Sequence, residues 1–335
     1  MSKAAASGVG RIMRAVKVSE FGAPEVLKVL SDVAIPVPTG KQVLIKIASA
    51  GVNPVDTYRR SGNYPLLLTL PFTPGSDASG IIEKTGPEAT KFKSGTRVYT
   101  SKCSSGSYAE YGVAAEDDVH VLADTLSFQQ GASIGVPYYT AFRSLFQRGN
   151  CKASETVLVH GASGAVGIAA LQLGSAYGLN LFGTAGTADG LKLIKEHGAM
   201  KAFNHNDKDY VQKIMDETEG EGVNVILEML ANVNLQKDLQ MLAPKGRVLV
   251  IGNRAPTEID ARLTMTKETS IIGVSLGSTT KEEFKEITAA MHAGFVKGYL
   301  QPVVGKEYPL EKVVEAHHEV IEHKEGSHGK IVLNM

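Results

Sequence analysis

Three glycines spaced three residues apart are the residues of this sequence best suited to chemistry. Gly161, Gly164 and Gly167 follow the short apolar run 155–160 and precede a stretch with helical apolar spacing that ends at Tyr177. A strand, a glycine turn and a helix in this order bring backbone N–H groups to a diphosphate at the positive end of the helix. An ordinary strand-to-helix connection can look the same, so the surrounding elements decide between the two interpretations.

Further strand-like runs alternate with helix-like runs after the turn. Together with 155–160 they predict six strands joined by right-handed crossovers, which is an α/β fold with a doubly wound parallel sheet. Such sheets bind ligands at the carboxyl ends of their strands, and each expected strand here ends in small or polar residues. We therefore expect a dinucleotide-binding domain. The other expected strands are 179–184, 202–203, 223–228, 247–251 and 270–275, and the helices between them include 191–197, 210–218 and 235–242.

The segment after the second strand indicates which dinucleotide binds. In NAD-binding folds an acidic residue about 20 positions past the glycines holds the ribose 2′-hydroxyl. Residues 182–187 carry no carboxylate, and the first acid to follow is Asp189. A neutral rim admits a 2′-phosphate, so we expect NADPH rather than NADH. His205, Lys192 and Arg254 are candidate partners for that phosphate.

The region before the glycine turn differs in texture. Its short strand-like runs are broken by Gly and Pro, which predicts a mainly β domain. After residue 275 come two amphipathic helices, 281–293 and 310–323, and a last strand, 330–333. We expect this C-terminal segment to fold back onto the β domain. The strand-like runs of the β domain are 13–18, 43–50, 79–83, 97–100 and 108–113.

Composition excludes several classes of partner. The 335 residues include 35 Lys and Arg against 35 Asp and Glu, so no strong field recruits nucleic acid or an acidic membrane. No apolar run approaches the roughly 20 residues that cross a bilayer. The two cysteines, Cys103 and Cys151, make a disulfide framework implausible. We expect a cytoplasmic protein.

Seven stretches between residues 13 and 313, among them 157–164 and 228–235, resemble the medium-chain dehydrogenase/reductase superfamily, and within it the zeta-crystallin family of NADPH:quinone oxidoreductases. The resemblance implies a GroES-like mainly β domain (1–135 and 273–335) interrupted by a Rossmann domain (136–272). It implies NADPH as cofactor, a quinone or activated alkene as substrate, and a homo-oligomer, dimer or tetramer. The matching stretches are Met-Arg-Ala-Val (13–16), Phe-Gly-x-Pro-Glu-Val-Leu-Lys (21–28), Gly-Val-Asn-Pro-Val-x-Thr-Tyr (51–58), Thr-Pro-Gly-Ser-Asp (73–77), Val-Leu-Val-His-Gly-Ala-Ser-Gly (157–164), Glu-Met-Leu-Ala-Asn-Val-Asn-Leu (228–235) and Tyr-Pro-Leu-Glu-Lys-Val (308–313).

The same resemblance supplies a set of cofactor residues. Tyr58 would face the nicotinamide side, the glycine turn would hold the diphosphate, and Gly186 with His205 would hold the adenosine phosphate. The remaining residues would line the ribose and nicotinamide. The diphosphate residues are Ser163, Gly164, Ala165 and Val166, and the lining residues are Asn234, Ile251, Gly252, Asn253, Arg254, Val274, Ser275 and Leu276.

The zinc ligands of alcohol dehydrogenases have no counterparts here. The segment 50–53 has no cysteine, and Ser76 stands where a histidine would be expected, so we predict no metal. Without a Lewis acid the acceptor must already be electrophilic, as quinones and activated alkenes are. Asn53 and Tyr64 are the candidate catalytic donors to its oxygen. The pair His317-His318 is interpreted as a solvated helix face.

Two other functions stay open. The segment 62–64 resembles the tyrosine motif of mitochondrial enoyl reductases, which favours an NADPH-dependent enal, enone or enoyl-thioester reductase as an alternative. Zeta-crystallin relatives have also been recruited as lens proteins and as binders of AU-rich RNA. The sequence offers little support for RNA binding, because it has no arginine-rich stripe and no interleaved aromatic residues.

Overall fold

Two compact units make up the protein. The computed structural model describes residues 11–64, 68–322 and 326–335, so residues 1–10 of the expected first domain lie outside the described residues. The first unit comprises residues up to 135 with 307–322 and 331–335, and the second comprises 136–306 with 323–330. The expected return to the first domain at residue 273 differs from this division, because residues 273–306 belong to the second unit.

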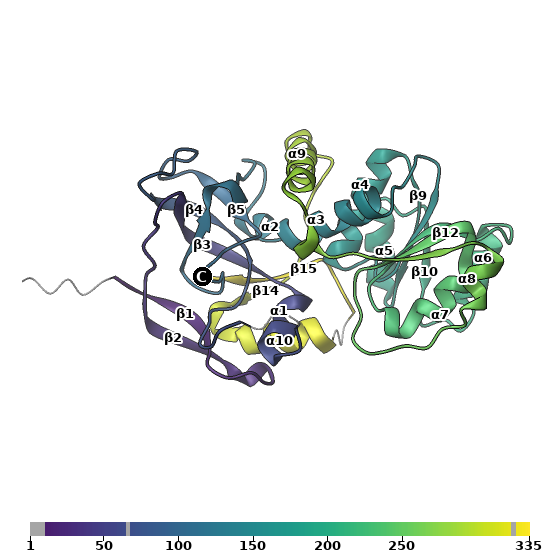
Figure 1. Ribbon diagram of the computed structural model, residues 1–335, viewed down its shortest axis with the longest axis horizontal. Helices are drawn as coiled ribbons and strands as arrows, with labels where there is room; N and C mark the ends of the chain where they lie inside the picture. The colour runs from purple at the N-terminus through teal and green to yellow at the C-terminus, as the bar shows by residue number, and fades with distance from the viewer. Residues whose placement is uncertain (1–10, 65–67, 323–325) are drawn as a thin grey trace, which may run out of the picture. The chain divides into compact units, whose positions relative to one another are not determined.

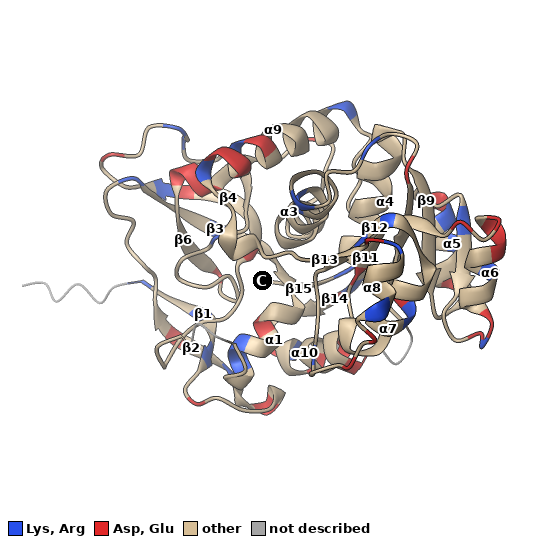
Figure 2. Cartoon of the chain, turned by 45° about the vertical axis from the view of Figure 1, so that its right-hand side comes forward, with Lys and Arg blue, Asp and Glu red and all other residues tan. Residues whose placement is uncertain are grey.

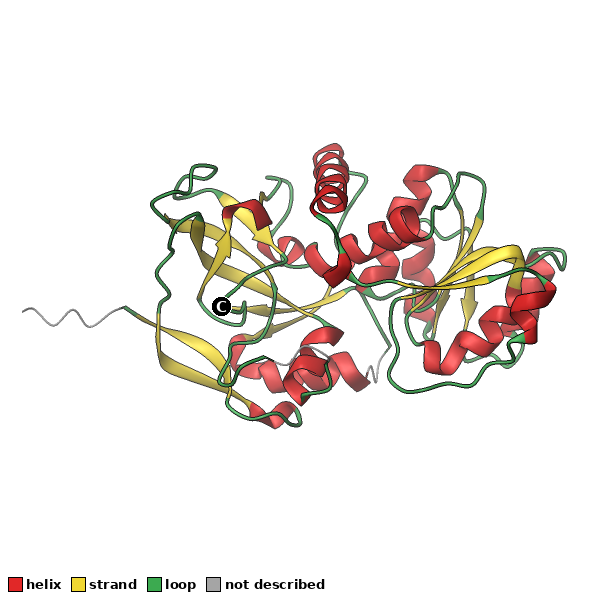
Figure 3. Ribbon diagram, viewed as in Figure 1, coloured by secondary structure: helices red, strands yellow, loops and turns green. Residues whose placement is uncertain are grey.

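The first unit is built mainly from strands (Figures 1 and 3). Its larger sheet has the order β14-β15-β3-β4-β5-β7, with β6 paired to β3, and β1 and β2 form a separate antiparallel pair. The C-terminal strand β15 runs antiparallel to β3, with Val332 opposite Gly51. Its elements are β1 (Ile12–Val18), β2 (Leu27–Ala34), β3 (Gln42–Val52), α1 (Pro54–Ser61), β4 (Asp77–Thr85), β5 (Arg97–Thr100), β6 (Tyr111–Ala115), β7 (Val119–Val121), α2 (Phe128–Gly131) and α10 (Val313–Glu322), together with β14 (Val304–Pro309) from residue 307 and β15 (Lys330–Asn334) from residue 331.

The second unit contains a six-stranded parallel sheet with the order β10-β9-β8-β11-β12-β13, which is the Rossmann order. Its central strands are short apolar runs because helices cover both faces. All six strands overlap the runs expected from the sequence. The elements are α3 (Gly135–Phe142), β8 (Thr156–Val159), α4 (Ala165–Tyr177), β9 (Asn180–Ala185), α5 (Ala188–Glu196), β10 (Lys201–Asn204), α6 (Tyr210–Glu217), β11 (Val223–Glu228), α7 (Ala231–Met241), β12 (Leu242–Val250), α8 (Arg262–Thr266), β13 (Ser270–Gly273) and α9 (Lys281–Lys297).

Helix α9 belongs to the second unit because its apolar face packs on α3. The ring of Phe295 meets Tyr138 edge-on with centroids 5.3 Å apart, and Phe284 meets Tyr139 in the same way at 5.6 Å. The helix begins at a capping box formed by Thr280 with Glu283. Aromatic contacts to α3, which lies far away in sequence, therefore decide the domain of this segment.

Strand β2 was not expected from the sequence. Its residues alternate poorly between buried and exposed, and most of them are exposed, so the strand lacks the periodic pattern of a half-buried strand. Acidic and basic residues are interspersed along α9, α5 and α6 (Figure 2). Within the described parts of the chain, none of the helices combines the length and apolar character needed to cross a bilayer.

Candidate functional site

The carboxyl ends of the six parallel strands form one edge of the second unit. In the sheet order β8 lies between β9 and β11, so the order of the strands reverses there, and doubly wound sheets bind ligands at such a reversal. Apart from Tyr58, every cofactor residue expected from the sequence follows one of these strand ends. The segments are 163–166 after β8, 186 after β9, 205 after β10, 234 in α7 after β11, 251–254 after β12 and 274–276 after β13.

The turn between β8 and α4 allows an anion to approach closely. Gly161 has a φ of 55°, in the left-handed region that favours glycine. A Cβ on Gly167 would lie 2.4 Å from the Cα of Ala162, so this position also requires glycine. The N-cap of α4 is Gly164, which has no side chain to occupy the N–H groups of the first turn. A diphosphate would meet those N–H groups and the positive end of the helix dipole.

The rim beyond β9 is neutral and closely packed. A Cβ added to Gly186 would lie 2.8 Å from Nε2 of His205. The carbonyl of Gly186 also accepts a hydrogen bond from Asn206 Nδ2 at 3.0 Å. Partial desolvation, and secondarily the charge of His160, lowers the pKa of His205, so this ring is uncharged at neutral pH and offers an N–H. A 2′-phosphate would therefore meet glycine and imidazole rather than a carboxylate.

Backbone hydrogen bonds tie the ends of β11 and β12 together. The carbonyl of Glu228 accepts from the N–H groups of Ile251 and Gly252 at 2.8 and 3.2 Å. A Cβ on Gly252 would lie 2.2 Å from the carbonyl oxygen of Met229, so only glycine permits this approach. Asn234 donates from Nδ2 to Glu228 Oε1 at 3.3 Å. The structure therefore brings the expected residues 234 and 251–252 to one place.

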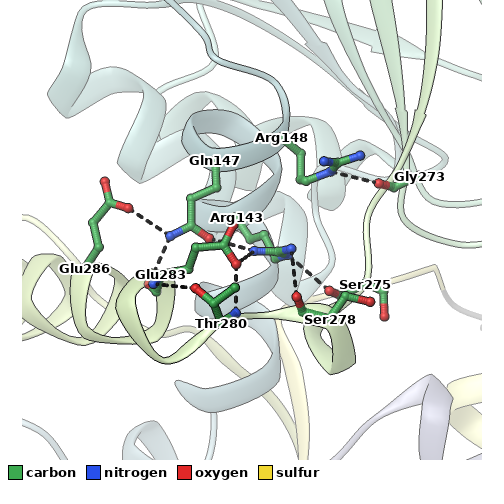
Figure 4. Close-up of polar contacts among 9 residues, drawn as sticks. All are labelled: Arg143, Gln147, Arg148, Gly273, Ser275, Ser278, Thr280, Glu283 and Glu286. Atoms are coloured by element: carbon green, nitrogen blue, oxygen red, sulfur yellow. Dashed lines mark hydrogen bonds and ion pairs between the residues drawn. The ribbon is translucent and has the colours of Figure 1, made fainter.

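Arg143 fixes the segment that follows β13 (Figure 4). This side chain is 5 % exposed and begins a π-helical turn, Arg143–Arg148, that continues α3. Its Nε donates to the carbonyl of Ser275 at 3.1 Å and its Nη2 to the carbonyl of Ser278 at 3.4 Å. Its Nη1 pairs with Glu283 at 2.8 Å. A buried guanidinium thus positions residues 274–276, and this role of Arg143 was not expected from the sequence.

A second group that sequence reasoning missed lies behind the same edge. His160 Nε2 is 2.9 Å from Asp238 Oδ1 and 3.7 Å from Glu228 Oε2, and all three side chains are buried. We call these three residues the buried acid cluster. A His and a Glu that each end an apolar strand were the available signal, but no local spacing connects them to Asp238 on α7.

The first unit holds the expected tyrosines and Asn53. Asn53 precedes α1 and is 1 % exposed; its Nδ2 donates to Asp77 Oδ2 and its backbone N–H to Asp56 Oδ2, both at 2.9 Å. Asn53 therefore anchors the start of α1. Tyr58, on α1, is half-buried, and so is Tyr64, whose ring centroid lies 5.3 Å from the guanidinium carbon of Arg59.

The expectation of a solvated His317-His318 face is wrong for His317. His317 is fully buried, and its Nδ1 accepts from Arg60 Nη1 at 3.4 Å. Its Nε2–H then donates to the hydroxyl of Tyr108 at 3.3 Å, and Tyr108 donates to Asp56 at 3.2 Å. His318 alone faces solvent. Packing of α10 against the β domain decides between the two neighbours.

Comparisons with known proteins agree with this architecture. The family model "Alcohol dehydrogenase GroES-like domain" matches residues 39–124, and "Zinc-binding dehydrogenase" matches 165–293. A human quinone oxidoreductase is 54 % identical over 96 % of this chain and 98 % of its own length.

Two solved structures share the whole fold. An NAD-dependent alcohol dehydrogenase has a TM-score of 0.89 at 26 % identity, and covers 96 % of this chain and 100 % of its own. A quinone oxidoreductase of Escherichia coli, solved in complex with NADPH, has a TM-score of 0.87 at 26 % identity and the same coverage. With these relatives and a Rossmann edge of the geometry described, the chain belongs to the quinone oxidoreductase family of the medium-chain dehydrogenase/reductase superfamily.

Proposed function

We propose that this protein catalyses the NADPH-dependent reduction of quinones, ortho-quinones among them, without zinc. The observation that carries the choice of NADPH is the rim at Gly186 and His205, where glycine packs against an uncharged imidazole. It lies at the strand end where an NAD-binding protein needs a carboxylate for the ribose. The relatives named quinone oxidoreductase support the same assignment.

The donor set of the chain supports chemistry without zinc. Zinc takes thiolate, imidazole and carboxylate ligands. Burial raises the pKa of the Cys103 thiol to about 11 and that of Cys151 to about 12, so both remain protonated. Asn53 and Asp77, from the segments that carry zinc ligands in alcohol dehydrogenases, bond to each other instead.

Each part of the site has a separate task in this proposal. When bound, NADPH supplies a hydride to an acceptor that is already electrophilic. The glycine turn holds the diphosphate, Gly186 and His205 accept the 2′-phosphate, and Arg143 fixes residues 274–276. Asn53 acts as a positioning residue for α1. From sequence alone, Tyr58 is assigned to the nicotinamide side of the cofactor and Tyr64 to the substrate. A reduced quinone takes its protons from water or from a tyrosine hydroxyl.

Substrate rates test the proposal against the enal, enone or enoyl-thioester alternative. Turnover with an ortho-quinone should exceed that with a crotonyl thioester and with alkenals, with NADPH as donor. Exhaustive chelation should leave the rate unchanged, and elemental analysis should find no stoichiometric zinc. A thioester preference of more than about tenfold, or activity that only zinc restores, would overturn the assignment.

We also propose a cytoplasmic homo-oligomer. The free thiols of both cysteines suit a reducing compartment, and sedimentation will give the number of subunits.

Binding of AU-rich RNA has weaker support, since acidic and basic residues are interspersed (Figure 2). If RNA does bind, its site should overlap the nucleotide edge, and saturating NADPH should displace it.

A further inference from the structure

The buried acid cluster contains more acceptors than donors. Glu228 and Asp238 are both 0 % exposed, and Nε2 of His160 lies 2.9 Å from Asp238 Oδ1 but 3.7 Å from Glu228 Oε2. Among the described residues, neither Glu228 Oε2 nor Asp238 Oδ2 has a hydrogen-bond donor. One oxygen of each carboxyl group lies within 4.8 Å of the other and of an imidazole nitrogen of His160. A proton held by the two carboxyl groups removes one of the two buried negative charges, and an unpaired buried carboxylate is costly.

A metal ion fits the cluster less well than a proton does. The three residues offer ligand atoms that lie within 4.8 Å of one another. Two zinc ligands at tetrahedral angles would place the imidazole nitrogen and carboxylate oxygen about 3.3 Å apart. The 2.9 Å between His160 Nε2 and Asp238 Oδ1 is the distance of a direct hydrogen bond.

The cluster connects two of the cofactor-facing turns. On one side His160 Nδ1 lies 3.3 Å from the hydroxyl oxygen of Thr184, which accepts from the N–H of Gly161 at 3.2 Å. On the other side Glu228 Oε1 accepts from the backbone N–H of Leu230 and from Asn234 Nδ2. The glycine turn and the turn that carries Asn234 therefore share one buried anchor.

We propose that Glu228 and Asp238 share one proton, and that this proton keeps the two turns in place so that its loss weakens NADPH binding. The inference rests on the proposed function for its link to NADPH. With the proton absent, two carboxylates would repel each other inside the protein, and Glu228 would move away from Asp238 together with Asn234.

The surroundings place the loss of this proton near neutral pH. Burial raises the pKa of Glu228 to about 7, with His160 opposing the rise and Asp238 adding to it. Burial alone would lower the pKa of His160, but the Asp238 carboxylate raises it overall. The other titratable groups that act on the cluster are Tyr210 from α6, Lys237 on α7 and His205 after β10.

The test compares Glu228→Gln with the wild type, because glutamine keeps the shape of a protonated carboxyl and a donor toward Asp238. NADPH dissociation constants are measured from pH 6 to pH 9, with the exposed Glu221→Gln as the control. Between pH 6 and pH 9, the NADPH dissociation constants of the wild type and of the control should rise several-fold more than that of Glu228→Gln. Titration of His205 and of the cofactor's own phosphate affects all three proteins alike, so it cannot cause a difference between their pH profiles. Parallel pH profiles, or a Glu228→Gln protein that has lost NADPH affinity already at pH 6, would overturn the proposal.

A second measurement needs neither cofactor nor variant. The infrared carbonyl band of a protonated carboxylic acid should persist in the wild type at pH 6 and disappear as the pH rises through about 7. Absence of that band at pH 6 refutes the shared proton. Failure of the wild type to bind NADPH at any pH would instead refute the proposed function, and the infrared band would still decide the shared proton.

Discussion

At the scale of single residues, cofactor choice depends on what stands just beyond β9. Thr184 is a poor place for a new acid, because this residue is fully buried and its hydroxyl already accepts from Gly161. Gly186 lies two residues further on, and its nearest neighbour is the flexible end of His205. The charge of the rim can therefore be changed at Gly186 without altering the sheet.

We expect Gly186→Asp to weaken NADPH binding selectively. A carboxylate beside the 2′-phosphate should cost about 1–3 kcal/mol, which is roughly 5- to 150-fold in the dissociation constant, and NADH should be affected much less. Gly186→Ala displaces His205 equally but adds no charge, so it serves as the control. Equal losses for both cofactors in Gly186→Asp would contradict the neutral-rim argument.

Tyr64 tests which acceptor the site serves. Tyr64→Phe should keep most quinone turnover, because a reduced quinone can take protons from water. Enal or enoyl reduction should fall by ~10²–10⁴-fold, since its carbanion-like intermediate needs a positioned acid. Tyr58→Phe should mainly raise the half-saturation constant for NADPH or for the acceptor, as expected when a positioning residue is altered. A hundredfold fall in quinone turnover in Tyr64→Phe would move the protein toward the enoyl reductase alternative.

At the scale of elements, α9 and the π-helical turn act as a clamp on the segment after β13 (Figure 4). Gln147 donates to the Glu283 carbonyl and to Glu286, both at 2.9 Å, and Arg148 donates to the carbonyl of Gly273 at 3.2 Å. Arg143, which lies earlier in the same turn, makes the buried contacts with the carbonyls of Ser275 and Ser278 and with Glu283. π-Helical turns inside helices are frequent at functional sites. Here the turn places the guanidinium of Arg143 against the backbone of residues 274–278.

Arg143→Met should lower the free energy of unfolding by on the order of 2–4 kcal/mol, because two carbonyls and Glu283 lose their partner. The half-saturation constant for NADPH should rise as residues 274–276 loosen. Arg148→Met, which removes a single exposed contact from the same turn, should cost less than about 1 kcal/mol. Urea unfolding and steady-state kinetics measure both effects. Arg148→Met matching Arg143→Met in either measurement would refute the clamp.

At the scale of the whole molecule, stability in acid depends on groups that the fold keeps neutral. Burial, followed by the charges of Arg60 and His318, lowers the pKa of His317 to about 3. In the unfolded chain its pKa is about 6.5. The unfolded state therefore binds the proton first, so stability falls as the pH drops from about 6.5 toward 3. The cost is on the order of a few kcal/mol.

His317→Gln should remove this part of the acid sensitivity. The unfolding free energy of the wild type should fall more steeply between pH 6.5 and pH 4 than that of His317→Gln, as urea titrations at each pH would measure. His318→Gln is the control, because hydrogen bonds to Glu25 and Glu322 raise the pKa of its exposed ring instead of lowering it. Identical pH slopes for the wild type and His317→Gln would contradict a buried neutral histidine.

Features that depend on residue type and short spacing could be predicted before any contact between distant segments was known. The strand, glycine turn and helix around Gly161 were predicted, and so was the alternation of six strands with helices. The lack of an acid in 182–187, which indicates NADPH, is read directly from the residues. These follow from local chemistry, because φ freedom, apolar periodicity and charge are properties of neighbouring residues.

Tertiary structure alone decided what depends on contacts between distant segments. It joined His160 to Asp238, set Arg143 beneath residues 275–278, placed α9 against α3, and buried His317 while leaving His318 exposed. Each outcome depends on which apolar face covers which strand, and burial is a property of the packed chain. A polar side chain at a strand end looks the same in sequence whether it meets water or a buried carboxylate.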